Sequence, residues 1–129
     1  MNMKTILVDA INGFVLEDKT IFQAMYDLLE TFPNRKIILT GAQDDVFKEF
    51  GLDKMPYEVF TLKHNPEKTD PKYFEILLQH FDLHKDDVVY FEHSKEAVKS
   101  AQSVGIKTYY YDETKQDLNA LKTFLAENL

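Results

Sequence analysis

The sequence predicts an α/β fold: a three-layer, Rossmann-like domain with a mainly parallel five-stranded sheet and helices on both faces. Two observations predict this class. Short apolar runs alternate with longer segments whose apolar residues recur at helical spacing, which is typical of a parallel sheet covered by helices. The first run, from Thr5 to Val8, is short, apolar and followed by a polar residue, as expected for a fully buried strand.

Five runs are predicted to be strands. The run around Val59 is less apolar than the others, so we expect it nearer an edge of the sheet. Behind the first strand, Asn12-Gly13 gives a hairpin-type turn signal. The five predicted strands are Thr5–Val8, Lys36–Leu39, Tyr57–Leu62, Val88–Phe91 and Ile106–Tyr110.

Capping residues predict where the intervening helices begin. Thr20 with Gln23 forms a capping box for a helix through Phe32. Asp70-Pro71 combines an N-cap with a proline at the first helical position. The remaining helices are predicted from about Gln43 to Phe50, from the Ser94 cap to near Gly105, and behind Thr114 with Asp117.

Composition narrows the possible functions. A chain of 129 residues is most simply one domain, spanning 1–129. The net charge of −7 argues against a nucleic-acid partner, but one lysine and helix N-termini can still hold a phosphate. The absence of cysteine excludes disulfide and thiolate chemistry. No signal peptide or spanning segment is recognisable, so we expect a cytoplasmic protein that does not bind membranes.

Polar residues close several of the predicted strands. Asp9 follows the first strand, Thr40 the second, and the pair Glu92-His93 the fourth, while Lys68 precedes a helix opening. Residues just past parallel strands collect along one edge of the sheet, where ligands bind. A carboxylate, a hydroxyl, an ammonium and a second acidic position are therefore expected to meet there, which predicts a phosphate site.

The pattern resembles the haloacid dehalogenase (HAD) superfamily over nearly the whole chain. The resemblance implies that the first and fourth strands are neighbours, and the short spacings from Asp9 to Thr40 and on to Lys68 resemble a small member without a cap domain. The segments that match best are Lys-Thr-Asp-Pro-Lys-Tyr-Phe from Lys68, Asp-Asp-Val-Val-Tyr-Phe-Glu-His-Ser from Asp86, and Ala-Gln-Ser-Val-Gly-Ile from Ala101.

The resemblance implies a role for each of four residues around a phosphoryl group. Asp9 would be the nucleophile, forming an aspartyl-phosphate intermediate. The Thr40 hydroxyl and the Gly41 amide would hold phosphoryl oxygens. Lys68 would bind the same group, neutralise its developing charge and steady Asp9.

A magnesium ion is the cofactor that the resemblance implies. Asp9, Glu92 and the backbone carbonyl of Ile11 would be its ligands, since this hard cation prefers oxygen. His93 is a candidate proton donor or soft metal ligand, or a polar residue that merely precedes the helix cap. The other histidines, His64, His80 and His84, lack metal-like spacing and are expected to be surface polar residues.

Three positions depart from the family pattern. Ile11 stands where a second aspartate usually acts as general acid and base, which typically contributes about 10²–10⁴ in rate. The fourth motif reads Glu92-His93 instead of Gly-Asp or Asp-Asp, and Ala97 stands where a further aspartate is usual. Loss of the acid matters least for an acyl phosphate or another good leaving group.

Two functions stay open at the level of the sequence. The first is a HAD-like protein with a partly degenerate phosphoryl-transfer site, either weakly active or a non-catalytic binder of a phosphorylated small molecule or protein. The alternative is a Mg²⁺-dependent phosphohydrolase that uses Asp9 as nucleophile. The sequence predicts neither the substrate nor the oligomeric state.

Overall fold

A five-stranded, wholly parallel sheet forms the centre of the protein. The computed structural model describes residues 3–129, and its strands lie in the order β3-β2-β1-β4-β5. The predicted fold class is confirmed, as are the neighbouring first and fourth strands and the edge position of the third. The strands are β1 (Thr5–Asp9), β2 (Lys36–Thr40), β3 (Glu58–Thr61), β4 (Val88–Glu92) and β5 (Lys107–Tyr110).

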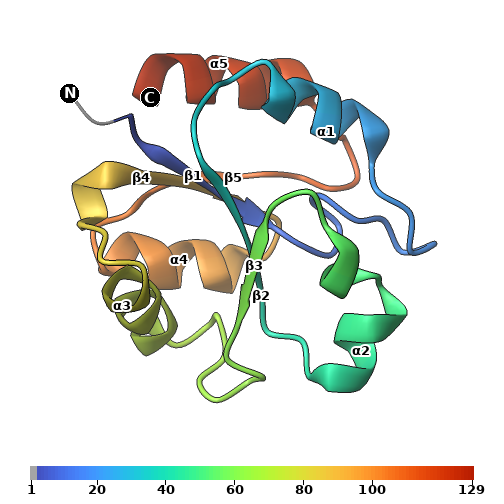
Figure 1. Ribbon diagram of the computed structural model, residues 1–129. Helices are drawn as coiled ribbons and strands as arrows, with labels where there is room; N and C mark the ends of the chain where they lie inside the picture. Colours follow the sequence, from blue (N-terminus) through green and yellow to red (C-terminus); the bar gives the residue numbers. More distant parts are fainter. Residues whose placement is uncertain (1–2) are drawn as a thin grey trace.

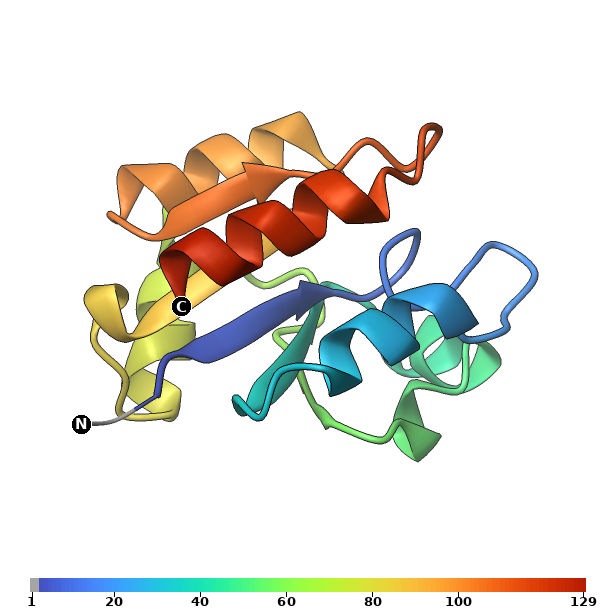
Figure 2. The ribbon, with the colours of Figure 1, turned by 90° about the horizontal axis from the view of Figure 1, so that it is seen from above.

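Helices cover both faces of this sheet. Figure 1 shows α1 and α5 on one face and α3 and α4 on the other, and Figure 2 shows α1 and α5 on the near side of the sheet, with β1 visible between them. The helices are α1 (Gln23–Glu30), α2 (Asp44–Glu49), α3 (Pro71–His80), α4 (Lys95–Ser103) and α5 (Leu118–Asn128), with 3-10 turns at Leu52–Lys54 and Lys85–Asp87. None of the helices within residues 3–129 has the length and apolar character that crossing a bilayer requires.

The alternating directions of strand side chains divide the core into two layers. In β1, Ile6 and Val8 belong to the apolar layer under α1 and α5, whereas Leu7 belongs to the layer under α3 and α4. All five residues of β1 are buried, because helices cover both faces. The same complete burial holds for β2 and β4, so the three central strands place their last residues at a sheltered edge.

The predicted capping box at the start of the first helix is wrong. Helix α1 begins at Gln23 behind Phe22, which makes no side-chain cap, and ends at Glu30. The Thr20 amide and hydroxyl both donate to Asp18 Oδ1, at 3.0 and 2.6 Å. This local Asp-x-Thr turn holds Thr20 outside the helix, which begins behind Phe22, so its hydroxyl does not accept from an amide of the first turn.

The same local turn explains the error at the last helix. Thr114 donates to Asp112 through both its amide and its hydroxyl, so it does not cap α5. Asp117 alone is the N-cap and accepts from Ala120 N at 3.0 Å. The predicted caps Asp70 and Ser94 are confirmed. Asp70 accepts from Lys72 N at 2.9 Å, and Ser94 accepts from Ala97 N at 3.3 Å.

The chain turns sharply behind β1 without forming a regular hairpin. Asn12 adopts a left-handed φ of 71°, and only isolated bridges pair Val15 with its neighbours within the described residues. A Cβ at Gly13 would lie 2.5 Å from the Asp9 carbonyl oxygen, so only glycine fits there. Phe14 N donates to the same oxygen at 2.9 Å. The turn therefore folds back onto Asp9 and fixes its backbone.

Buried and exposed neighbours on α3 test the assignment of its inner face. We expect Leu77→Ala to lower the free energy of unfolding by about 2–5 kcal/mol, because Leu77 is fully buried and its loss leaves a cavity. The adjacent Ile76 is 37% exposed, so Ile76→Ala should cost much less. Urea unfolding of both variants measures the difference, and equal losses would show that the two faces are wrongly assigned.

Candidate active site

Lys68 lies between two buried carboxylates. Its Nζ donates to Asp9 Oδ1 at 2.9 Å and to Glu92 Oε1 at 2.7 Å, with Leu39 O at 3.4 Å. Adjacent strands bring the two acids together, since Asp9 ends β1 and Glu92 ends the neighbouring β4. Each lies inside its strand rather than just past it, one residue beyond the predicted strand ends.

His93 approaches the same carboxylates from the other side. Its Nδ1 contacts Asp9 Oδ2 and lies 3.2 Å from Glu92 Oε2, and its backbone N–H donates to Asp9 Oδ2 at 3.1 Å. Ser94 N donates to Glu92 Oε2 at 3.0 Å, and the Tyr90 hydroxyl donates to Glu92 Oε1. Every carboxylate oxygen of Asp9 and Glu92 therefore has a donor from the chain itself.

Burial and charge together perturb the pKa values of this cluster. The hydrogen bond to Asp9, followed by that to Glu92, raises the pKa of His93 to about 10. Burial alone would lower the pKa of Lys68, but the charges of Asp9 and then Glu92 raise it. Burial alone would raise the pKa of Glu92, but the charge of Lys68 lowers it. The pKa of Asp9 is raised, because burial and the charge of Glu92 outweigh the two cations. At neutral pH Lys68 and His93 are thus both cationic beside the acids.

A hollow of about 210 Å³ opens beside this cluster and is lined by the other predicted residues. Asp9, Lys68 and His93 line it, together with Ile11, Thr40 and Gly41 in a wider lining that also includes Ala42, Val46 and His64. The Thr40 hydroxyl oxygen accepts from Ala42 N at 3.1 Å, which leaves its proton free to donate to a ligand. The predicted residues therefore share one edge of the sheet, while their roles stay predictions.

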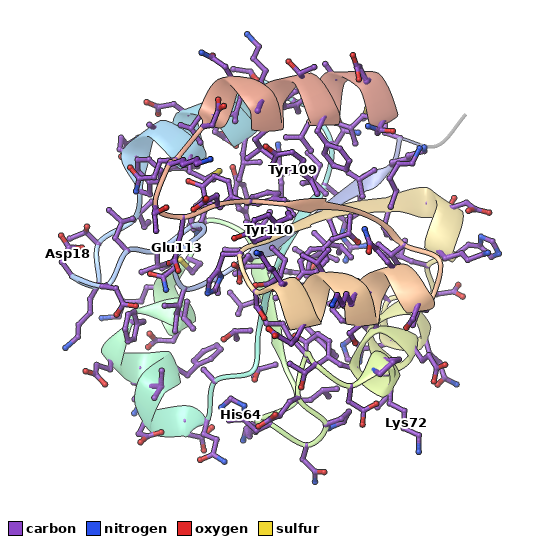
Figure 3. All side chains as sticks on the ribbon, turned by 180° about the vertical axis from the view of Figure 1, so that it is seen from behind. Asp18, His64, Lys72, Tyr109, Tyr110 and Glu113 are labelled. Carbon is purple, nitrogen blue, oxygen red and sulfur yellow. The ribbon has the colours of Figure 1, made fainter. Side chains whose placement is uncertain are left out.

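His64 is exposed, as the sequence analysis expected, and it lies at the rim of this site. Left-handed φ values of 55° at Lys63 and 62° at His64 turn the loop after β3 toward Gly41. A Cβ added at Gly41 would lie 3.0 Å from His64 Nδ1. His64, labelled in Figure 3, also lines a second hollow of about 250 Å³ with Lys68 and His93. No sequence spacing signals this approach, because it depends on how a loop folds.

Two buried tyrosines that the sequence analysis did not single out support the site. The Tyr73 hydroxyl, from α3, donates to Thr40 O at 2.8 Å and so fixes the end of β2. Tyr90 lies two residues before Glu92 on the same face of β4 and donates to its carboxylate. Both hydroxyls are buried, and their hydrogen bonds hold the backbone and the acid in fixed positions.

The donor set tests whether a magnesium ion fits here. Asp9, Glu92 and His93 bring one potential ligand atom each within 4.8 Å of one another. Mg²⁺ prefers oxygen and retains several waters, so it needs carboxylate oxygens that are free to bind it. Here Lys68 and His93 donate to those oxygens instead. The residues as arranged do not fit the ion.

Comparison with solved structures identifies the fold. A Corynebacterium glutamicum protein of unassigned function superposes with a TM-score of 0.67 at 17% identity, covering 97% of this chain and 96% of that one. A HAD-superfamily hydrolase of subfamily IA from Geobacter sulfurreducens gives 0.64 at 13% identity, covering 85% and 90%. A HAD-family enzyme from Bacteroides thetaiotaomicron, an aspartate-to-alanine mutant with magnesium and inorganic phosphate, gives 0.61 at 14%, covering 84% and 94%.

These likenesses show that the chain has the HAD-like fold. No protein-family model matches the sequence, and no curated protein matches it either. Between Asp9 and Thr40 the described chain contains only a turn and α1, and between Thr40 and Lys68 only α2, a 3-10 turn and β3. These short connections carry no inserted domain, in agreement with the predicted lack of a cap.

Removing Lys68 tests the ion cluster. We expect Lys68→Ala to lower the free energy of unfolding by about 3–5 kcal/mol, because two buried acids lose their shared cation. Lys72 is exposed on α3 and labelled in Figure 3, so Lys72→Ala should change stability by less than about 0.5 kcal/mol. Denaturant unfolding compares the variants, and equal small effects would mean that the cluster does not stabilise the fold.

The raised pKa of His93 predicts a pH dependence of stability. A pKa raised from 6.5 to about 10 on folding gives stability that is fully present below pH 6.5. That stability is lost as the pH rises toward about 10, because the unfolded chain releases the proton first. Unfolding free energies across this window should therefore fall in the wild type, and His93→Asn should flatten the fall. The matched substitution His84→Asn, at an exposed position, should leave the fall of the unfolding free energy as it is in the wild type.

Proposed function

We propose that this protein binds a phosphorylated ligand at the Asp9 edge of its sheet and that its phosphoryl-transfer activity is strongly attenuated. One observation carries the proposal. Thr40, Gly41 and Lys68 line a single hollow with Asp9, whereas the general acid and base position is the apolar Ile11. The elements that would hold a phosphate are thus together, and the element that would speed its transfer is missing.

The contacts of Asp9 explain why turnover would be slow. A carboxylate that attacks phosphorus must present a free lone pair toward it. Asp9 Oδ1 accepts from Lys68, and Oδ2 accepts from both the backbone and the ring of His93. Oδ1 alone keeps an unshared lone pair, and the Lys68 ammonium beside it lowers the nucleophilicity of that oxygen. The leaving oxygen would then depart without the general acid that typically contributes about 10²–10⁴ in rate.

Anion binding needs less rearrangement than transfer does. A phosphoryl group in the hollow would contact the Lys68 ammonium and could accept a hydrogen bond from the Thr40 hydroxyl. Charge-assisted hydrogen bonds of this kind are strong. His64 lies at the rim between the two hollows and is placed to contact whatever carries the phosphate. Without an inserted domain above it, the edge is open to a phosphorylated protein as well as to a small molecule.

The comparisons lend support to the choice of ligand. The Bacteroides enzyme with a similar fold was obtained with inorganic phosphate and magnesium, which is a fact about that enzyme. Of these two ligands, the hydrogen-bond donors of the present chain suit phosphate. A cytoplasmic location and the absence of a nucleic-acid partner belong to this proposal and rest on the sequence.

Phosphate binding tests the proposal directly. We expect inorganic phosphate to bind the wild type in a 31P NMR or calorimetric titration. Thr40→Val should weaken binding by about tenfold, because a hydrogen bond to a charged group is lost. Thr40→Ser should retain binding, and Thr123→Val, on the exposed side of α5, should leave it unchanged. No binding to the wild type, or equal binding to all four proteins, would refute the assigned site.

Turnover separates this proposal from the Mg²⁺-dependent phosphohydrolase. We expect any phosphate release from an acyl phosphate to exceed that from a phosphomonoester by about 10²–10⁴, because only the second needs a general acid. Whatever release occurs should disappear in Asp9→Asn. Fast phosphomonoester hydrolysis that requires Mg²⁺ and Asp9 would favour the alternative enzyme. The assay is phosphate release with and without Mg²⁺, with Asp9→Asn as the control.

A further inference from the structure

We infer that His93 fills the place of a divalent cation between Asp9 and Glu92, so that this site holds its phosphorylated ligand without a metal. The inference deepens the proposed function and rests on it for the ligand alone. The contacts within the cluster stand independently, because they involve only residues of the chain.

Lys68 and His93 contact different oxygens of the two acids. The oxygens that face Lys68 are Asp9 Oδ1 and Glu92 Oε1. The remaining pair, Asp9 Oδ2 and Glu92 Oε2, faces His93 Nδ1, which contacts the first and lies 3.2 Å from the second. A cation that bridged the two acids would need this remaining pair. The imidazole N–H occupies the bridging position instead.

Asp9 and Glu92 are 1% and 0% exposed, so their carboxylates need partners within the protein. Lys68 contacts one oxygen of each acid, and the His93 ring contacts the other oxygen of Asp9 and lies 3.2 Å from that of Glu92. An ion between the two acids would therefore have to displace one of these side chains from its oxygens.

The backbone beside the two acids is fixed by hydrogen bonds. The His93 N–H donates to the same Asp9 oxygen that its ring contacts. The next residue, Ser94, donates its own backbone N–H to Glu92 Oε2 and caps α4 with its side chain. These bonds hold the His93 backbone beside the two acids, so a ring turned aside would give up its contacts with both carboxylates.

A gain of metal binding tests the inference. His93→Asp removes the internal cation and adds a third carboxylate, and metal affinity rises with the number of charged oxygen ligands. We expect the wild type to show no specific Mn²⁺ or Zn²⁺ binding at millimolar concentration, by calorimetry and, for Mn²⁺, by electron paramagnetic resonance. We expect His93→Asp to bind Mn²⁺ at least about tenfold more tightly. His84→Asp makes the same change at an exposed helical cap and should bind no more Mn²⁺ than the wild type.

Two results of the metal titrations would overturn the inference: specific metal binding by the wild type, or no gain of Mn²⁺ affinity in a folded His93→Asp. Should that variant not fold, the wild type still decides. Phosphate affinity that is unchanged by excess chelator supports the inference, and affinity that rises with Mg²⁺ overturns it. The metal titrations contain no phosphate, so a failure of phosphate binding would refute the proposed function while leaving the metal result standing.

Discussion

The attraction between Lys68 and its two acids is the interaction on which this site depends. Asp9 and Glu92 are brought together by the pairing of β1 with β4, and without a cation their adjacency would be strongly unfavourable. Lys68 compensates both from the loop before α3, and His93 completes the compensation from the far side. The sheet thus fixes where the acids lie, and the two cations determine what they can still bind.

The architecture could be predicted from the sequence because a parallel sheet imposes strong local patterns. The central strands are buried on both faces, so their apolar runs stand out, and the residues that close them must share one edge. This reasoning was enough to expect Asp9, Thr40 and Glu92 in one place. That the strands of Asp9 and Glu92 are neighbours was implied in addition by the resemblance to a known fold.

The two capping errors have local physical causes that the spacing rules do not include, and the position of His64 at the site also depends on local conformation. Thr20 and Thr114 each look like a helix cap, but each follows an aspartate two residues earlier and bonds to that carboxylate instead. His64 reaches Gly41 only because two consecutive residues adopt left-handed conformations, which no periodicity reveals. The use of His93 was likewise undetermined, because a histidine in that position fits a ligand, a donor or a cation equally well until its neighbours are known.

The cluster also links distant parts of the chain, with consequences for the order of folding. Lys68 lies 59 residues from Asp9 in sequence, and His93 lies 84 residues from it. Closing loops of this length costs entropy before their contacts repay it, so such contacts form late. Helices α1 and α3 can gain structure from nearby residues, whereas the charged cluster has to wait for β1 to meet β4. A nascent chain therefore carries its acids hydrated and apart, and ligand binding becomes available only once β1 and β4 have paired.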